Sequence, residues 1–358
     1  MKNINTIITG TGSYIPEIKV PNQHFVKHIF YEKDETIIEG SGHDIVEKFR
    51  DITGIRERRW AKDDQNASDL GTIAAERAIQ DAGIDRETID QIIVAENFGD
   101  VVKGTIQSDV LTSIASRIKH NLGIKNPSCI PYDIIFGCPG WVQGVIQADS
   151  YIKSGLAKRC LVIGAETLSR VVDEKDRDSM IFSDGAGATI IEGVESDEKC
   201  GILSISMASH TGEEAGYLYL GKSNEPDSDP KIRYIKMLGR KIYEYSLSQV
   251  PVAMKVALDK AEIPIEQVKK ILIHQANEKM DEAIVQRFYK LYKIREIPDK
   301  IMPMSIHDLG NSSVATIPTL YDMILKGQLP EHKINKGDIL IFASVGAGMN
   351  INAFVYKA

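Results

Sequence analysis

The sequence is poor in cysteine, in tryptophan and in long apolar runs, and each shortage excludes a class of protein. The 358 residues include only four cysteines and two tryptophans. No two cysteines have CxxC spacing, so neither a zinc site nor a redox pair is indicated. No apolar run is long enough to span a bilayer, and residues 1–5 lack a signal-peptide core. We therefore expect a cytoplasmic protein with reduced thiols, no bound metal and no membrane partner.

The chain also lacks an excess of positive charge. Lysine and arginine number 43 against 50 acidic residues, which gives a net charge of −7. This balance argues against a general nucleic-acid binder. Hydrophobic residues make up 43% of the chain, which is ample for one large or two medium domains.

Apolar strands alternate with helical segments along the chain. The patterns predict strands at residues 6–10, 91–95, 129–136 and 159–165, and helices at 67–82, 105–120 and 141–153. The glycines at 10 and 12 lack the third glycine of a dinucleotide fingerprint, so we expect a turn there and not a phosphate site. The alternation predicts an α/β protein with a parallel sheet.

The second half of the chain repeats the order of helix, turn and strand patterns found in the first half. Residues 257–273 match 78–94, and residues 340–344 match 161–165, both at an offset of 179 residues. Two matches at one offset, half the chain length, predict a duplication. We expect one half at residues 1–195 and the other at 196–358, with a site at their seam.

Cys138 lies where an apolar strand is expected to meet a helix. Gly137 permits a sharp turn, and Pro139 suits a first helical position because its missing N–H would be unpaired there. The sulfur would then lie near the positive end of the helix dipole, which favours the reactive thiolate. The alternative is an inert buried thiol, since free cysteine is often buried.

Two polar positions in the second half can join Cys138. His274 ends the apolar strand 271–273, and Asn311 lies in a polar turn before the helix 314–325. The alternatives are a structural histidine and a helix cap, although Ser312 or Ser313 can cap instead.

Thiol, imidazole and amide together suit acyl transfer through a thioester. The glycine-rich residues 345–348 can add a backbone N–H for an oxyanion. A cysteine protease uses the same residue types, but proteases of that kind do not have this duplicated layout.

On these motifs the chain resembles the thiolase-fold condensing enzymes, and most closely the β-ketoacyl-acyl-carrier-protein synthase III family. The matching segments occur in the family's order, at residues 10–16, 53–58, 137–141, 184–188, 274–277, 310–313 and from 346 onward. The resemblance implies a thiolase-like α/β fold of two duplicated layered αβαβα halves. It also implies an acyltransferase that needs no cofactor, uses acyl thioesters and malonyl-acyl carrier protein, and forms a homodimer in which residues 100–108 reach the partner's acyl pocket.

The resemblance also implies a role for each site residue. Cys138 is similar to the nucleophile that takes the acyl group. His274 and Asn311 are similar to the pair that binds the malonyl thioester carbonyl and favours decarboxylation. The backbone N–H groups of Cys138 and Ala347 resemble the oxyanion hole, although glycine is usual at Ala347.

The coenzyme A site departs from the family pattern. The tryptophan and arginine usual before Thr53 are replaced by Lys48 and Ile52. Phe49 can stack in place of the tryptophan, and Arg177 keeps a second arginine of the site. Asn277 is expected to bind substrate, and the segment 29–44 is longer than the family norm.

The expected docking surface for the carrier protein is altered as well. Lys279 replaces the arginine that usually follows the histidine motif. This replacement keeps the positive charge but loses the two parallel hydrogen bonds that a guanidinium group can donate. Glu244 stands where a lysine is usual, and Arg240 and Lys241 can compensate one turn earlier.

Three other functions stay open at this point. The first is acyl transfer or condensation of other acyl thioesters in a specialised pathway, which the altered coenzyme A site and Pro139 favour. The second is an aldol-type hydroxymethylglutaryl synthase with Glu96 as the base. The third is a non-catalytic partner subunit, against which the complete set of Cys138, His274 and Asn311 argues.

Overall fold

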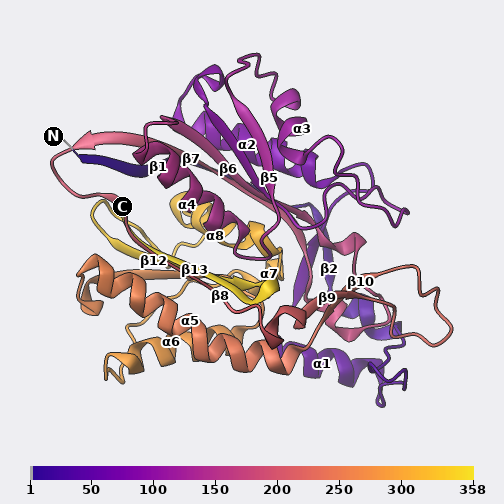
Figure 1. Ribbon diagram of the computed structural model, residues 1–358. Coiled ribbons are helices and arrows are strands. Elements are labelled where there is room, and N and C mark those ends of the chain that lie inside the picture. The colour runs from indigo at the N-terminus through magenta and orange to yellow at the C-terminus, as the bar shows by residue number, and fades with distance from the viewer. Residues whose placement is uncertain (1–2) are drawn as a thin grey trace.

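The computed structural model describes residues 3–358 and consists of two sheets with helices between and outside them (Figure 1). The first sheet has the strand order β1 (Asn3–Tyr14), β7 (Asp184–Ser196), β6 (Arg159–Thr167), β4 (Gln91–Ala95), β5 (Ile130–Ile134). The second has the order β8 (Gly201–Ser209), β13 (Asn350–Lys357), β12 (Ile339–Gly346), β11 (Val268–Ile273). Two short antiparallel pairs stand apart, β2 (Ile18–Pro21) with β3 (Glu57–Trp60) and β9 (Leu218–Gly221) with β10 (Tyr234–Met237).

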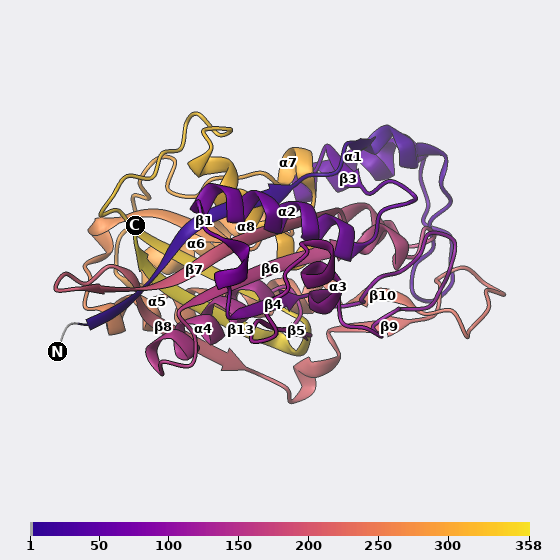
Figure 2. The ribbon, with the colours of Figure 1, turned by 90° about the horizontal axis from the view of Figure 1, so that it is seen from above.

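The helices form three layers around the two sheets (Figures 1 and 2). Outside the first sheet lie α2 (Ala67–Ala82) and α3 (Ile114–Asn121), and outside the second lie α5 (Gly239–Ala261) and α6 (Glu278–Leu291). Between the sheets run α4 (Gly140–Lys153) and α8 (Thr316–Leu325). At the end that carries β9 and β10 lies α1 (Gly42–Thr53), and the short α7 (Ile306–Leu309) contacts β3. The expected αβαβα layering is thus one stack, to which each half contributes one sheet.

The two sheets repeat one another in order and direction. In each, the first three strands are antiparallel neighbours, and the third pairs in parallel with the fourth. The strands of the first sheet fall within residues 3–196 and those of the second within 201–357. This agreement supports the predicted duplication, while the boundary between residues 195 and 196 stays a prediction.

The expectation of a parallel sheet was only partly right, because both sheets are mixed. β7 runs antiparallel to β6, and β13 runs antiparallel to β12. Residues 168–183, between β6 and β7, hold only short 3-10 turns. Parallel neighbours need a crossover connection, usually a helix, whereas antiparallel neighbours do not. The sequence of this connection has no helical spacing of apolar residues, and that absence could have predicted the antiparallel pair.

The predicted helix at 67–82 is confirmed, and its ends follow from local sequence. Asn66 and Asp69 form a capping box, in which the Asn66 N–H donates to Asp69 Oδ2 at 2.8 Å. Gly83 ends the helix with φ 64°, a left-handed conformation that glycine adopts without strain.

The predicted helix at 105–120 was wrong in its first half. α3 begins at Ile114, where Asp133 of β5 accepts the N–H groups of Ile114 and Ala115 at 2.7 Å each. Ser113 caps the same end. The helix start is therefore set partly by a carboxylate from a distant strand, which sequence periodicity does not contain.

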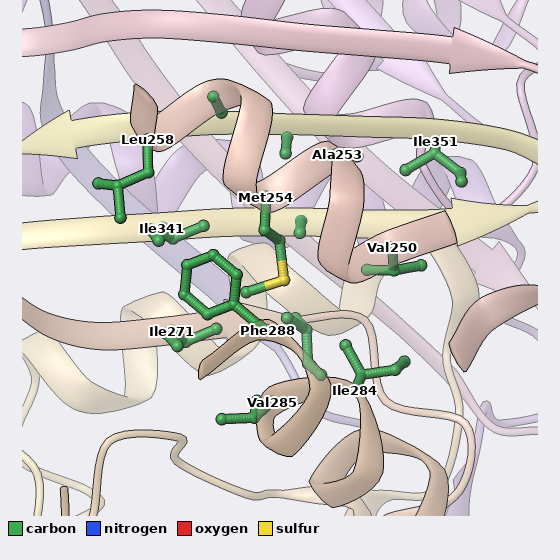
Figure 3. Close-up of a cluster of buried hydrophobic side chains, with 14 of the residues drawn as sticks. Val250, Ala253, Met254, Leu258, Ile271, Ile284, Val285, Phe288, Ile341 and Ile351 are labelled. Carbon is green, nitrogen blue, oxygen red and sulfur yellow. The ribbon is translucent and has the colours of Figure 1, made fainter. Parts of the chain in front are cut away.

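Apolar side chains fill the space between the layers. Met254 and Leu258 of α5 and Phe288 of α6 pack with Ile271 and Ile341 of the second sheet (Figure 3). A separate cluster joins Trp141 of α4 to Phe342 and Phe354 between the sheets. This packing fixes the start of α4, and with it Cys138, against the ends of both sheets.

In the part of the chain from residue 3 to residue 358, no helix is long and apolar enough to cross a membrane.

Candidate active site

Cys138 lies in a tight turn between β5, which ends at Ile134, and α4, which begins at Gly140. Pro139 is the N-cap residue, one position before the helical place that the sequence suggested. Gly137 has φ 65°, in the left-handed region that favours glycine. The sharp turn between strand and helix that the sequence predicted at Cys138 is therefore present.

A second backbone segment passes directly against this turn. A Cβ atom added to Gly137 would lie 2.5 Å from the Ala347 nitrogen, and one added to Gly346 would lie 2.5 Å from the Cys138 nitrogen. Side chains are excluded at both positions because the two backbones are in contact. The backbone at Gly137 and Cys138 therefore lies directly against the backbone at Gly346 and Ala347.

The thiol of Cys138 is not a ready thiolate. Burial raises its pKa to about 11, and the hydroxyl of Ser313, with Oγ 3.5 Å from Sγ, lowers it in part. The expectation that the helix start would favour thiolate therefore misjudged the balance, because desolvation of the sulfur is the larger effect.

His274 follows β11, and its backbone N–H donates to the Ala343 carbonyl at 3.0 Å. Burial lowers the pKa of its imidazole to about 4, while a hydrogen bond to the Ser313 backbone raises it slightly. The ring is consequently neutral near pH 7. Its Nδ1 atom is buried and finds no partner among residues 3–358.

Asn311 is 4% exposed and held from three sides. Its backbone pairs with Ile181 and Ser183, and its Oδ1 accepts the N–H of Ser313 at 2.8 Å. α8 has no side-chain cap, so neither Asn311 nor the two serines after it cap that helix. Within the described chain the amide Nδ2 has no protein partner and is the group left for a ligand.

One cavity of about 510 Å³ joins these three side chains to the surface. Cys138, His274 and Asn311 line it, and residues of α1 and of the start of α5 line it as well. Of the expected substrate residues, Phe49, Arg177 and Asn277 also line this cavity, as does Arg240; Lys279 and Lys241 do not.

The expected coenzyme A residues are present but largely engaged. Phe49 is 8% exposed and packs in a small apolar cluster with Val46. Arg177 forms an ion pair with Glu32 at 3.4 Å. Asn277 caps α6 by accepting the Met280 N–H at 3.0 Å. Neither a free aromatic face nor an unpaired arginine is thus offered by these residues.

The expected carrier-protein residues are exposed. Lys279 lies at the start of α6, and Arg240 and Lys241 lie at the start of α5. Arg240 pairs with Glu244 at 2.9 Å, one turn along the same helix.

Sequence reasoning missed two residues beside Cys138. Ser313 was considered only as a helix cap, yet its hydroxyl contacts Cys138 Sγ. Asn97, which follows β4, accepts the Gly137 N–H at 3.0 Å and donates to Ser313 Oγ at 3.2 Å. The available signal for Asn97 was its place at the carboxyl end of a strand beside β5, where sites in such sheets gather.

Glu96 does not take the place that an aldol-type synthase would require. Its carboxylate accepts the N–H of Gly99, it is 2% exposed and it does not line the cavity. No group of three or more metal-ligating side chains occurs in the stretch that the structure describes.

Comparison with known proteins gives one consistent family. The sequence profile described as 3-Oxoacyl-[acyl-carrier-protein (ACP)] synthase III matches residues 132–211, and that of the C-terminal part matches residues 258–358. Beta-ketoacyl-[acyl-carrier-protein] synthase III of Paracoccus denitrificans is 32% identical, with 98% of each chain covered. The protein of that name from Staphylococcus haemolyticus is also 32% identical, with 99% of each covered.

The solved structures agree. The 3-oxoacyl-[acyl-carrier-protein] synthase III of Aquifex aeolicus superposes with a TM-score of 0.78 at 29% identity, covering 99% of this chain and 100% of that one. The Thermus thermophilus enzyme gives 0.81 at 26% identity, with 98% and 99% covered. With the cysteine turn, the histidine and the asparagine in one cavity, these likenesses show that the chain belongs to the β-ketoacyl-[acyl-carrier-protein] synthase III family of condensing acyltransferases.

Proposed function

We propose that the protein loads an acyl group onto Cys138 and condenses it with a malonyl thioester on acyl carrier protein. Carbon dioxide leaves, and the product is a β-ketoacyl thioester, the first condensation of a fatty-acid chain. The observation that carries this proposal is that Cys138, His274 and Asn311 line the same cavity.

In loading, the sulfur of Cys138 attacks the carbonyl carbon of the donor thioester. The backbone N–H groups of Cys138 and Ala347 receive the developing oxyanion, and the closeness of their two backbones supports that role. The proton that Cys138 loses is balanced by the one that the departing donor thiolate gains, so no cofactor is required.

In condensation, the malonyl group loses carbon dioxide and its thioester oxygen gains negative charge. His274 and the amide Nδ2 of Asn311 donate hydrogen bonds to that oxygen. A neutral imidazole supports this role because it carries one N–H group, which can donate a hydrogen bond while the ring stays uncharged. The burial that lowers the pKa of His274 to about 4 keeps it in that form.

The cavity is suited to a thin, uncharged arm such as pantetheine. Its walls include Leu218, Met237 and Met280, which favour a chain without charge. We propose that three exposed cations, Lys279, Arg240 and Lys241, dock the acidic surface of the carrier protein. Of these, Arg240 lines the cavity.

We also propose a homodimer formed along β5. This strand is an edge of the first sheet, and its Ile130 is 49% exposed. The segment before α3 exposes Ile106 and Leu111 by 71% and 91%. An edge strand with unpaired backbone groups beside exposed apolar side chains supports the burial of this surface against a second copy of the chain. A monomeric mass by light scattering at micromolar concentration would contradict this part.

A cytoplasmic location belongs to the same proposal. All four cysteines are free thiols, which supports a reducing compartment.

The test is intact-protein mass spectrometry after incubation with a panel of acyl thioesters, followed by addition of malonyl-acyl carrier protein. We expect an acyl adduct on the wild type and its loss on adding the malonyl substrate. Cys138→Ala should form no adduct, whereas Cys129→Ala, Cys160→Ala and Cys200→Ala should load normally. An adduct that persists on Cys138→Ala protein would overturn the assignment.

One observation favours a second candidate function, condensation or transfer of other acyl thioesters in a specialised pathway. The mouth of the cavity presents Ile52, 47% exposed, and an arginine already paired with Glu32. The same mass spectra separate the two functions, because the second predicts loading without consumption of the adduct by malonyl thioesters.

A further inference from the structure

Ser313 contacts each of the three side chains that define the site. Its Oγ lies 3.5 Å from Cys138 Sγ, and its N–H donates to Asn311 Oδ1 at 2.8 Å. Its backbone also hydrogen-bonds to the ring of His274. The residue has φ 52°, a left-handed conformation that side chains rarely adopt. Two of the three contacts are made by the backbone, and only the contact with sulfur depends on the side chain.

Two further residues, Asn97 and Glu166, lie beside the Ser313 hydroxyl. Asn97 Nδ2 donates to Ser313 Oγ at 3.2 Å and also donates to Glu166. On its other side Asn97 Oδ1 accepts the N–H of Gly137, next to the nucleophile, at 3.0 Å. A hydroxyl has one proton to give. Because Asn97 donates to Ser313 Oγ, the hydroxyl proton is left for an acceptor, and the acceptors within reach are Cys138 Sγ and Glu166.

The state of Glu166 bears on which acceptor that proton meets. Its carboxyl is 2% exposed, and burial together with the nearby Glu96 raises its pKa well above the usual range. The Ser313 hydroxyl also lies within hydrogen-bonding reach of Glu166, a contact that lowers the Glu166 pKa in part. An ionised carboxylate is the stronger acceptor for that proton, so a neutral Glu166 competes with sulfur more weakly. A neutral Glu166 also places no negative charge beside a thiolate.

We propose that the hydroxyl of Ser313 donates a hydrogen bond to the sulfur of Cys138 and stabilises its thiolate, with Asn97 and Glu166 as positioning residues. The proposal rests on Cys138 being the nucleophile of the proposed function. The thiolate arises twice in that cycle. In loading it forms the S–C bond to the acyl group, while the donor's C–S bond breaks. In condensation the new C–C bond forms from the decarboxylated malonyl carbon, the S–C bond breaks, and its electron pair returns to sulfur, which takes a proton from water.

The expected size follows from the charge on the acceptor. A hydrogen bond to a charged group contributes enough to shift a pKa by about one unit, which is about tenfold in thiolate at a fixed pH. The probe is iodoacetamide, which alkylates thiolate without using any substrate-binding group. Peptide mass spectrometry reports alkylation of Cys138 separately from that of the other cysteines.

The first test compares Ser313→Ala with Ser312→Ala. The Ser312 hydroxyl faces Thr316 Oγ1 at 3.4 Å, so its loss is a matched control. We expect Ser313→Ala to alkylate about tenfold more slowly at each pH, with its profile shifted upward by about one unit, while Ser312→Ala follows the wild type. Equal profiles for Ser313→Ala and wild type, with equal melting temperatures, would overturn the proposal.

The second test concerns the positioning residues. Asn97→Asp keeps an acceptor for the Gly137 N–H but removes the donor to Ser313 and adds a negative charge, so alkylation should slow by at least tenfold. Glu166→Gln replaces a neutral acid with a neutral amide, and we expect its rate to stay within about twofold of wild type. A clear acceleration in Glu166→Gln would show an ionised Glu166 and overturn its assigned state.

The role of Ser313 and the proposed function are tested by separate outcomes. If Ser313→Ala shifts the alkylation profile but no thioester ever loads Cys138, the hydrogen bond stands and the proposed function falls. If loading occurs and the profile does not shift, the function stands and the role of Ser313 falls.

Discussion

Asn311 Oδ1 accepts the backbone N–H of Ser313 at 2.8 Å, which orients the side-chain amide of a residue that is 4% exposed. The flip of an amide is ambiguous unless its partners fix it, and here a backbone donor fixes the oxygen. The NH₂ group is therefore the part of Asn311 that a bound thioester oxygen would meet. Because a backbone N–H makes the contact, substitution of the Ser313 side chain does not disturb it.

The first prediction concerns the pH dependence of the Cys138 thiol. Because burial holds the pKa of Cys138 at about 11, the thiolate fraction of the free enzyme should rise about tenfold per pH unit from about pH 7 to about pH 10. The rate of Cys138 alkylation by iodoacetamide measures this directly. A plateau below about pH 8 would mean that the sulfur is a thiolate at rest, as the helix start alone suggested.

The second prediction concerns His274. Its pKa of about 4 lies below the ordinary value because burial disfavours the charged imidazolium. Decarboxylation of malonyl-acyl carrier protein should therefore stay level between about pH 6 and about pH 8 and decline only as the pH falls toward about 4. Release of radiolabelled carbon dioxide measures it, and a decline centred near pH 6.5 would show an exposed histidine instead.

A third prediction uses two glycines with nearly equal φ. Gly137 has φ 65° and Gly83 has φ 64°, but only Gly137 has another backbone within contact of an added Cβ. Alanine at either position should cost about 1–2 kcal/mol of folding free energy from the left-handed backbone. Gly137→Ala should in addition lower the loading rate by about 100-fold or more, because Ala347 must move away from the oxyanion.

Urea unfolding and acyl loading of the two variants make the comparison. The account of the Ala347 contact fails if Gly137→Ala loads as fast as Gly83→Ala.

The fourth prediction concerns the acyl donor. Arg177 is paired with Glu32 and Arg240 with Glu244. A phosphate group that binds either arginine at the mouth of the cavity must therefore compete with an existing ion pair. Loading from acyl-coenzyme A and from acyl-pantetheine should then differ in kcat/KM by about threefold or less, about 0.6 kcal/mol.

Ile52→Trp supplies a flat ring at the exposed position on α1. It should raise the preference for the coenzyme A ester by about fivefold, as one aromatic contact of about 1 kcal/mol would. A wild type that already prefers acyl-coenzyme A by far more than threefold would show that the nucleotide is bound elsewhere on the mouth.

Local signals were sufficient for much of the fold and for singling out three residues that line one cavity. The helix over 67–82 carries its own capping box and terminal glycine, and Cys138 and His274 each follow a clear apolar strand. The offset of 179 residues pointed to two sheets of one design, which the repeated strand order supports.

The remaining features depend on contacts between distant segments. Ile106 and Leu111 have helical spacing with Ile114, but they are exposed and only Ile114 is buried. Spacing does not tell which apolar residues meet the core. Ser313 and Asn97 are 216 positions apart, so no local pattern relates them. The raised pKa of Cys138 depends on how many atoms enclose the sulfur, which a motif does not record.

The central claim, that Cys138 carries the acyl group while His274 and Asn311 serve the malonyl step, is tested most directly by measuring both half-reactions on His274→Ala and Asn311→Ala. Each variant should lose about 100-fold to 1000-fold in decarboxylation of malonyl-acyl carrier protein, because each removes one donor to the developing oxyanion. Acyl loading of Cys138, followed by intact mass, should fall far less in both. Equal losses in the two half-reactions would contradict the account and make His274 chiefly a base for the thiol.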